Sequence, residues 1–257
     1  MLNGARAMSL NSPILSRHSA AVTASFGARA ATYELYAEMQ RAIAARLAGL
    51  LPDATRPRVL ELGCGTGLFS RHLVARYSDG SFVLTDAAPA MVAKCRENLA
   101  AARASKISFE IMDASRPGGE GPYDVIALSM TLHWLADQTA SLERLRQLLA
   151  PSGVLIYAAL GRASFAEWRA ALTDEGLPSG LPAIQPLPGI VAEERLFPDA
   201  GALGFLRSMK SVGGLTPRDG YRPLSPGALR RAIRAADAKG GGITWHIVYG
   251  RLTATVD

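Results

Sequence analysis

The stretch Val59-Leu60-Glu61-Leu62-Gly63-Cys64-Gly65-Thr66-Gly67 decides the fold of this chain. An apolar run ends there in alternating glycines, and the residues that follow have the apolar spacing of a helix. Glycine lets the backbone turn sharply and leaves main chain bare against a ligand, while a helix N-terminus offers free N–H groups. The stretch therefore predicts a strand, a turn and a helix that hold a cofactor. A dinucleotide-binding fingerprint would need its third glycine where Leu68 stands, so that interpretation fails by one residue.

Short apolar stretches alternate with longer amphipathic ones after this turn, the pattern of a parallel sheet covered by helices. A helix over 30–51, which Pro52 ends, precedes the first strand. The predicted strands are 58–62, 81–86, 107–112, 124–129 and 153–160, and the predicted helices between them are 67–77, 89–101 and 139–149.

The regular alternation ends at Gly161. Residues 175–198 are rich in proline and glycine and predict a loop or lid. Helical spacing returns over 202–211 and 226–238, and 244–253 predicts a closing strand. We expect a flexible leader over 1–17, with a transit peptide as the alternative, and one domain over 18–257 with its lid or substrate region at about 175–235.

The composition excludes several classes of protein. With 257 residues, 49% apolar and 19% charged, the chain is neither disordered nor collagen-like. No apolar run approaches the roughly 18 residues of a membrane span, and we expect a cytoplasmic protein. Two cysteines and four scattered histidines predict no metal site. The net charge of +6 favours an acidic partner, but the basic residues are spread along the chain, which disfavours nucleic acid.

Two carboxylates follow the next two predicted strands. Asp86 ends the second strand beside the glycine turn, where an acid accepts both hydroxyls of a ribose. NAD and S-adenosylmethionine (SAM) sites share this feature, so Asp86 alone does not choose between them. Asp113, followed by Ala114, comes after the third strand and could receive an adenine amino group, with a plain turn-forming aspartate as the alternative.

With these elements the chain resembles the class I SAM-dependent methyltransferases over about 58–160, most specifically in E-x-G-x-G-x-G. The resemblance implies a Rossmann-like α/β fold, a mostly parallel seven-stranded sheet with helices on both faces, and SAM as the cofactor. It places Glu61 near the methionine end of SAM, Asp86 at the ribose, and Asp113 at the adenine. The implied cofactor-binding residues are Glu61, Gly63, Cys64, Gly65, Gly67, Asp86, Ala87, Met91, Asp113, Ala114 and Ser129; for Met91 a core position is the alternative.

Patches outside this core resemble the BioC-type malonyl-carrier-protein O-methyltransferases of biotin synthesis. Position 133 is histidine where that family more often has glutamine, and the segment before Arg195 is short. The Leu-His-Trp form is similar to relatives that assemble mitochondrial respiratory complexes. A non-catalytic assembly or binding protein therefore remains an alternative, as does a methyltransferase for another small carboxylic acid. The patches are Phe26-Gly27-x-x-Ala30-x-x-Tyr33, Ala37-x-x-Gln40, Leu132-His133-Trp134, and the segments 206–214 and 244–250.

This narrower resemblance implies that the chain methylates the free carboxylate of a malonyl thioester on acyl carrier protein or coenzyme A. That carboxylate is already ionised at neutral pH, so positioning replaces a general base. Arg207 is the expected carboxylate clamp, because a guanidinium grips a carboxylate in a planar fork, and Tyr33 could offer its hydroxyl. The expected substrate-binding residues are Phe26, Tyr33, His133, Trp134, Arg207 and Lys210, of which His133 is interpreted as a structural hydrogen-bonding group.

An acyl carrier protein is acidic where its enzymes bind it, so the resemblance also implies a basic rim. The expected partner is therefore an acidic carrier protein bearing a malonyl thioester, with neither nucleic acid nor membrane as a partner, and the chain is expected to be a monomer. Residues that fit such a rim are Arg218, Arg222, Arg230, Arg231 and Arg234, for which a solvated helix face is the alternative.

Overall fold

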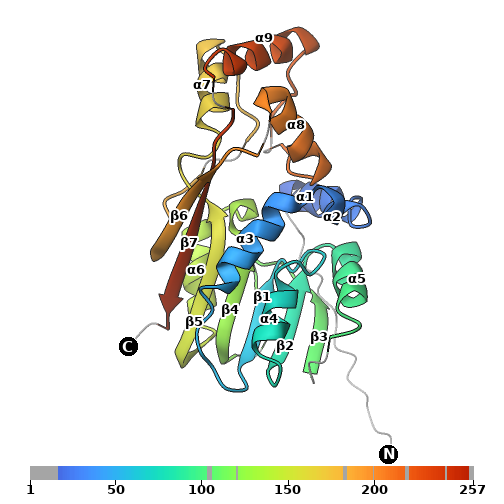
Figure 1. Ribbon diagram of the computed structural model, residues 1–257, viewed down its shortest axis with the longest axis vertical. Coiled ribbons are helices and arrows are strands. Elements are labelled where there is room, and N and C mark those ends of the chain that lie inside the picture. Colours follow the sequence, from blue (N-terminus) through green and yellow to red (C-terminus); the bar gives the residue numbers. More distant parts are fainter. Residues whose placement is uncertain are drawn as a thin grey trace, which may run out of the picture.

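The computed structural model describes residues 17–102, 106–119, 121–181, 184–198, 200–217, 220–240 and 242–254. The expected leader lies outside the described residues, apart from position 17 where the first helix begins, and so does Arg218 of the expected rim. The described chain forms a seven-stranded sheet in the order β3-β2-β1-β4-β5-β7-β6, with helices on both faces (Figure 1). The expected α/β fold is confirmed.

The parallel part of the sheet follows the predicted strands closely. It consists of β1 (Arg58–Leu62), β2 (Ser81–Asp86), β3 (Lys106–Ile111), β4 (Tyr123–Ser129) and β5 (Leu149–Leu160). β5 starts at Leu149 rather than at 153, because Leu149 pairs with Tyr123 ahead of a register shift. Since β1 lies between β2 and β4, the carboxyl ends of three strands meet beside the glycine turn.

The helices of the parallel part are α4 (Ser70–Arg76), α5 (Pro89–Asn98) and α6 (Gln138–Arg146). α4 begins at Ser70 rather than at 67, because Gly67 belongs to the turn and has a positive φ of 93°. The predicted helix over 30–51 is two helices, α2 (Tyr33–Tyr36) and α3 (Glu38–Ala48), separated by the buried Ala37. This break lets α2 contact α8 while α3 packs on β4 and β5.

The prediction of a loop over 175–198 is wrong in part. β6 (Ile190–Leu196) lies there and pairs antiparallel with β7 (Trp245–Thr253), at the edge of the sheet. The strand was hidden from pattern analysis because Glu193, Glu194 and Arg195 interrupt the apolar run, and an exposed edge strand tolerates such charged residues. The pattern also missed α1 (Arg17–Gly27) and α7 (Ala166–Asp174).

α7, α8 (Gly201–Ser211) and α9 (Pro226–Asp237) gather at the far end of β6 and β7 and are called the cap below (Figure 1). Aromatic packing joins the cap to β7, since the Phe165 ring lies 4.7 Å from that of Trp245 and 5.0 Å from that of Phe205. α1 and α2 lie between α8 and the carboxyl ends of the parallel strands (Figure 1). Within the described part of the chain, no helix is both long and apolar enough to span a membrane.

Candidate active site

The glycine turn between β1 and α4 forms part of the wall of a cavity of about 290 Å³, called the first chamber. Gly63 and Gly65 have positive φ values of 74° and 54°, which favour glycine. A Cβ on Gly63 would lie 2.2 Å from Thr131 Oγ1, whereas a Cβ on Gly65 would meet nothing within 4 Å. Gly63 is therefore required by packing, and Gly65 leaves main chain open to the cavity.

Asp86 and Asp113 bring two carboxyl groups to this chamber. Asp86 Oδ2 accepts a hydrogen bond from Gly65 N at 3.0 Å, and Oδ1 accepts one from Ala88 N at 2.8 Å. Each oxygen has a further lone pair for a ligand hydroxyl. Burial raises the pKa of Asp86, and its backbone hydrogen bonds oppose that shift. Asp113 Oδ1 accepts a hydrogen bond from Ser115 N at 2.8 Å, which holds its side chain in a turn at the chamber wall.

Most of the expected cofactor-binding residues line the first chamber, but Gly67 does not. A Cβ on Gly67 would meet Cys95 Sγ at 3.1 Å, so this glycine lies behind the turn. The expected residues that line the chamber are Gly63, Cys64, Gly65, Asp86, Ala87, Met91, Asp113, Ala114 and Ser129.

Glu61 also lies outside the chamber wall, in contrast to the expected place near the methionine end. Its carboxyl group is buried beneath the glycine turn, where Oε2 accepts a hydrogen bond from Ser70 Oγ at 2.5 Å. Burial raises the pKa of Glu61 to about 8. Because Ser70 is the first residue of α4, this hydrogen bond ties Glu61 to the start of that helix, while Glu61 Oε1 is buried without a hydrogen-bond partner among the described residues.

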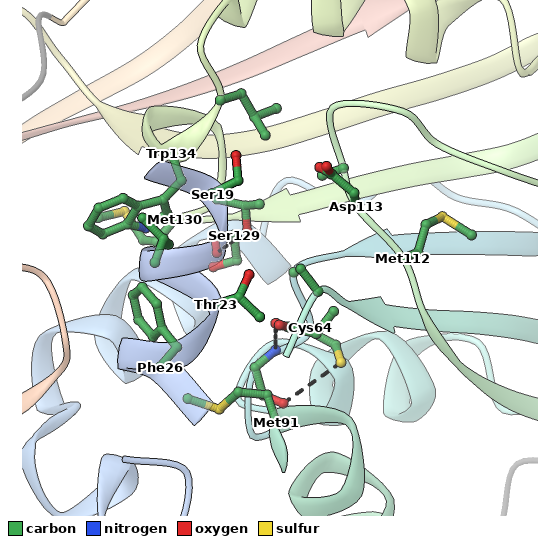
Figure 2. Close-up of a pocket in the computed structure, with 18 of the residues that line it drawn as sticks. Ser19, Thr23, Phe26, Cys64, Met91, Met112, Asp113, Ser129, Met130 and Trp134 are labelled. Atoms are coloured by element: carbon green, nitrogen blue, oxygen red, sulfur yellow. Dashed lines mark hydrogen bonds between the residues drawn. The ribbon is translucent and has the colours of Figure 1, made fainter. Parts of the chain in front are cut away.

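α1 covers the chamber, and Phe26 is the one residue of this helix that the sequence interpretation had named for the site. Ser19, Thr23 and Phe26 extend from one face of α1 toward the pocket (Figure 2). Helical spacing of these positions is visible in the sequence, but serine and threonine gave no apolar signal. Phe26 packs edge-on against Trp134 with ring centroids 5.4 Å apart, at the opposite end of the pocket from Asp113 (Figure 2).

A smaller cavity of about 60 Å³, the second chamber, adjoins the first. The two share the lining residues Phe26, Tyr33, Gln40, Met130 and Trp134. The polar side chains that line the second chamber are those of Tyr33, Gln40, His133 and Arg169, and its apolar walls are Leu160, Phe165, Leu181, Ile184, Met209, Val212 and Trp245.

Three of these polar side chains are neutral near pH 7. Burial raises the pKa of Tyr33, an effect that the negative charge of Asp86 strengthens. Burial lowers the pKa of His133 to about 4. His133 Nδ1 and Gln40 Oε1 are buried and have no hydrogen-bond partner among the described residues. The expected structural hydrogen bond is therefore missing at His133 Nδ1, and these atoms are available to a ligand.

The structure corrects the expected place of Arg207 and Lys210. Both side chains are exposed on α8 and line neither chamber. The reason is the orientation of α8, which buries Ala202, Phe205 and Met209 on its inner face.

Arg169 of α7 instead places a guanidinium at the second chamber. Sequence reasoning missed Arg169 because the pattern did not reveal α7, and so it gave no indication of which face of that helix is buried.

The expected basic rim is only partly available to a partner. Arg222, Arg230 and Arg234 are exposed, whereas Arg231 Nε lies 2.9 Å from Glu175 Oε2 and ties α9 to the end of α7. Across the described ranges, no group of histidine, cysteine and acidic side chains is arranged to hold a metal ion.

Comparisons with known proteins agree with this geometry. A family model described as "Methyltransferase domain" matches residues 60–155. The malonyl-acyl carrier protein O-methyltransferase of Magnetococcus marinus is 34% identical over 249 residues, covering 89% of this chain and 91% of that protein. The biotin biosynthesis bifunctional protein BioCD of Bordetella avium is 37% identical over 240 residues, covering 88% of this chain and 50% of that protein.

A solved structure shows the fold without close sequence similarity. The N-methyltransferase NodS from Bradyrhizobium japonicum, in complex with S-adenosyl-L-homocysteine (SAH), matches with a TM-score of 0.50 at 15% identity. The match covers 90% of this chain and 96% of that chain, so the two share an architecture over nearly their full lengths.

Proposed function

The chain belongs to the malonyl-acyl carrier protein O-methyltransferase family, and on that premise we propose that it transfers the methyl group of SAM to the free carboxylate of a malonyl thioester on acyl carrier protein. In this role it serves an early step of biotin synthesis, a proposal supported by the Bordetella relative, which is named as a biotin biosynthesis protein. The observation that supports this function most is the pair of adjoining chambers, of which the first has the groups for a nucleoside and the second is mainly apolar.

The first chamber fits SAM. Asp86 has lone pairs for the two ribose hydroxyls, and Asp113 can accept a hydrogen bond from the adenine amino group. Main chain at Gly65 is open to the cavity, and the buried acceptor Gln40 Oε1 suits a positively charged group. SAM bound there supplies an electrophilic methyl group on a positively charged sulfur.

The residues between the chambers position the reaction. A carboxylate oxygen forms a bond to the methyl carbon from the side opposite the sulfur, and the electron pair of the broken carbon–sulfur bond stays on sulfur. No proton moves, because the malonyl carboxylate is already ionised near pH 7. Phe26 and Trp134 exclude water at the boundary, and the protonated Tyr33 hydroxyl can donate a hydrogen bond to the carboxylate.

The carrier protein is the macromolecular partner in this proposal. Its acidic surface would meet exposed guanidinium groups such as those of Arg222, Arg230 and Arg234. The chain would act as a monomeric, single-domain enzyme of the cytoplasm, with neither nucleic acid nor membrane as a partner.

Mass spectrometry of purified components tests the function. The protein, SAM and malonyl-acyl carrier protein should yield the carrier-bound methyl ester together with SAH, and complementation of a biotin auxotroph that lacks this activity should follow. Malonyl-coenzyme A and free malonate, assayed in parallel, measure carrier preference and separate this activity from a methyltransferase for another small acid. A protein that binds SAH but forms no ester from any of the three would instead be a non-catalytic assembly or binding protein.

A further inference from the structure

The second chamber has a distinct electrostatic character. Among its described lining residues, only Arg169 has a side chain that is charged near pH 7. A guanidinium stays protonated in proteins and presents its donors in a plane that matches a carboxylate. A guanidinium on the wall of an otherwise uncharged chamber favours an anionic ligand there, because hydrogen bonds between a guanidinium and a carboxylate are stronger than those between neutral groups.

The framework around Arg169 fixes its position. Arg169 N donates a hydrogen bond to Phe165 O at 2.9 Å, and both side chains line the second chamber. Glu167, between them in the sequence, accepts hydrogen bonds from both N and Oγ1 of Thr244, the former at 2.8 Å. The start of α7 is thus tied to β7, in addition to the ring contact between Phe165 and Trp245. A side chain on such a tied helix can hold a substrate group in a defined place.

The first chamber provides the complementary charges. Asp86 and Asp113 line it, and the only basic side chain among its described lining residues is Arg116. A cationic methyl donor therefore fits the first chamber and an anionic acceptor fits the second. The two reactants would meet where the chambers adjoin. The residues that line both chambers there are Phe26, Tyr33, Gln40, Met130 and Trp134.

We propose that Arg169 binds the malonyl carboxylate and makes the second chamber selective for a free acid over its methyl ester. This inference rests on the function proposed above, because it identifies the group that holds the substrate of that reaction. Methylation removes the negative charge, so the ester loses its attraction to the guanidinium and is released. An acetyl thioester lacks the carboxylate and gains nothing from Arg169.

Binding to the SAH-saturated protein tests this directly, with malonyl-pantetheine, its methyl ester and acetyl-pantetheine as small probes and calorimetry as the measurement. The wild type should bind malonyl-pantetheine at least about 30-fold more tightly than either neutral probe, the range of a desolvated charge pair. Arg169→Met should reduce this preference to within about threefold, and Arg169→Lys should retain part of it, since lysine keeps the charge but not the fork.

Two arginine variants serve as comparisons. Arg162→Met, an exposed arginine in the turn before α7, should keep the full preference and controls for loss of positive charge. Arg207→Met tests the clamp that the family resemblance implied. SAH affinity and thermal stability, measured on each variant, show whether the first chamber and the fold remain intact. If Arg169→Met does not fold, Arg169→Lys decides the question, because full preference in that variant contradicts recognition by the guanidinium fork.

The outcomes separate this inference from the proposed function. An unchanged preference in Arg169→Met, no preference in the wild type, or a loss confined to Arg207→Met would overturn the role of Arg169, even if malonyl-acyl carrier protein is methylated. A wild type that prefers the free acid through Arg169 but forms no ester would overturn the proposed function and leave the carboxylate site standing.

Discussion

The two chambers are built from different kinds of parts. The first is lined by the glycine turn and by residues that follow the ends of neighbouring parallel strands, with α1 as its cover. The second is formed by side chains from α1, α2, α3, the segment after β4, the end of β5, β7, and the cap with its adjoining loops. A turn at a strand end depends on local sequence, whereas a chamber between distant segments depends on how those segments pack. Changes in the first chamber should therefore act through backbone and polar contacts, and changes in the second through substrate selectivity.

The largest expected effect is on the glycine turn. Gly63→Ala should lower the free energy of unfolding by about 2–4 kcal/mol, because the positive φ and the overlap with Thr131 add together. Thr131 Oγ1 cannot easily move, since it donates to carbonyl oxygens of Leu62 and Ser129, each at 3.2 Å. Urea denaturation measures the change.

Gly65→Ala is the matched control for that experiment. It shares the positive φ but has open space at its Cβ position, so it should cost only about 1 kcal/mol of stability. Its methyl group would project toward the first chamber and weaken SAH binding. Equal destabilisation by the two substitutions would show that packing at Gly63 is not what shapes the turn.

Asp86→Asn should weaken SAH binding by roughly 10- to 100-fold, the range for hydrogen bonds to a charged group. Asparagine keeps one acceptor oxygen, but its NH₂ group faces a backbone N–H where Asp86 has its second oxygen. Calorimetric titration with SAH measures the loss. Affinity of the SAH-saturated variant for malonyl-pantetheine should be unchanged, and a matching loss there would contradict the independence of the chambers.

Glu61, which lies beneath the first chamber, should make the free energy of unfolding depend on pH. Its ordinary pKa of 4.5 is raised to about 8 in the folded protein, so between these values the folded state binds more protons than the unfolded state. Stability should therefore fall as pH rises through this window, by up to about 1.4 kcal/mol per pH unit, and Glu61→Gln should remove that slope. Urea denaturation of both proteins at several pH values between 5 and 8 tests it. Parallel slopes would show that Glu61 ionises normally in the fold.

The smallest expected effect concerns the hydrogen bonds that link Glu34 of α2 to α4 and α5 beside the first chamber. Glu34 Oε1 accepts hydrogen bonds from Arg71 Nη2 at 2.7 Å and Asn98 Nδ2 at 2.9 Å. Asn98 also donates to Thr66 O in the glycine turn at 2.8 Å. Because the ion pair is partly exposed, Glu34→Gln should weaken SAH binding by less than about 1 kcal/mol, and less still at high salt.

Glu97→Gln is the control for the Glu34 tie. Glu97 forms an exposed pair with Lys94 along α5 and touches neither chamber, so its loss should leave SAH affinity unchanged at any salt concentration. If the two substitutions changed SAH affinity equally, the effect of Glu34→Gln would come from the change in net charge and not from the lost hydrogen bonds.

Sequence reasoning succeeded where structure is local. The glycine turn, the strands around it and the carboxylates after them were predictable, because hydrophobic periodicity and turn residues act over a few positions. It failed at β6, whose charged residues hide an edge strand, and at α1, whose pocket face is partly polar. The split of the helix over 30–51 also escaped it, since the separate contacts of α2 with α8 and of α3 with the sheet cause it.

Arg207 and Arg169 show most clearly what sequence reasoning could not decide. The resemblance pointed to Arg207, and the structure turns that side chain to solvent while Arg169 lines the second chamber. Arg169 lies on α7 and Arg207 on α8. Which of the two reaches the second chamber depends on which face of each helix is buried when the cap packs.

The sequence by itself determined the parallel sheet, the bend that receives the cofactor, and the family to which the chain is similar. Only the tertiary structure decided which arginine lines the second chamber, and that Gln40 Oε1 and His133 Nδ1 are buried there without a hydrogen-bond partner among the described residues. The physical reason is the range of the interactions: backbone geometry at a turn is set by adjacent residues, whereas burial of a side chain is set by segments more than a hundred residues away, as Arg169 and Gln40 show at one chamber.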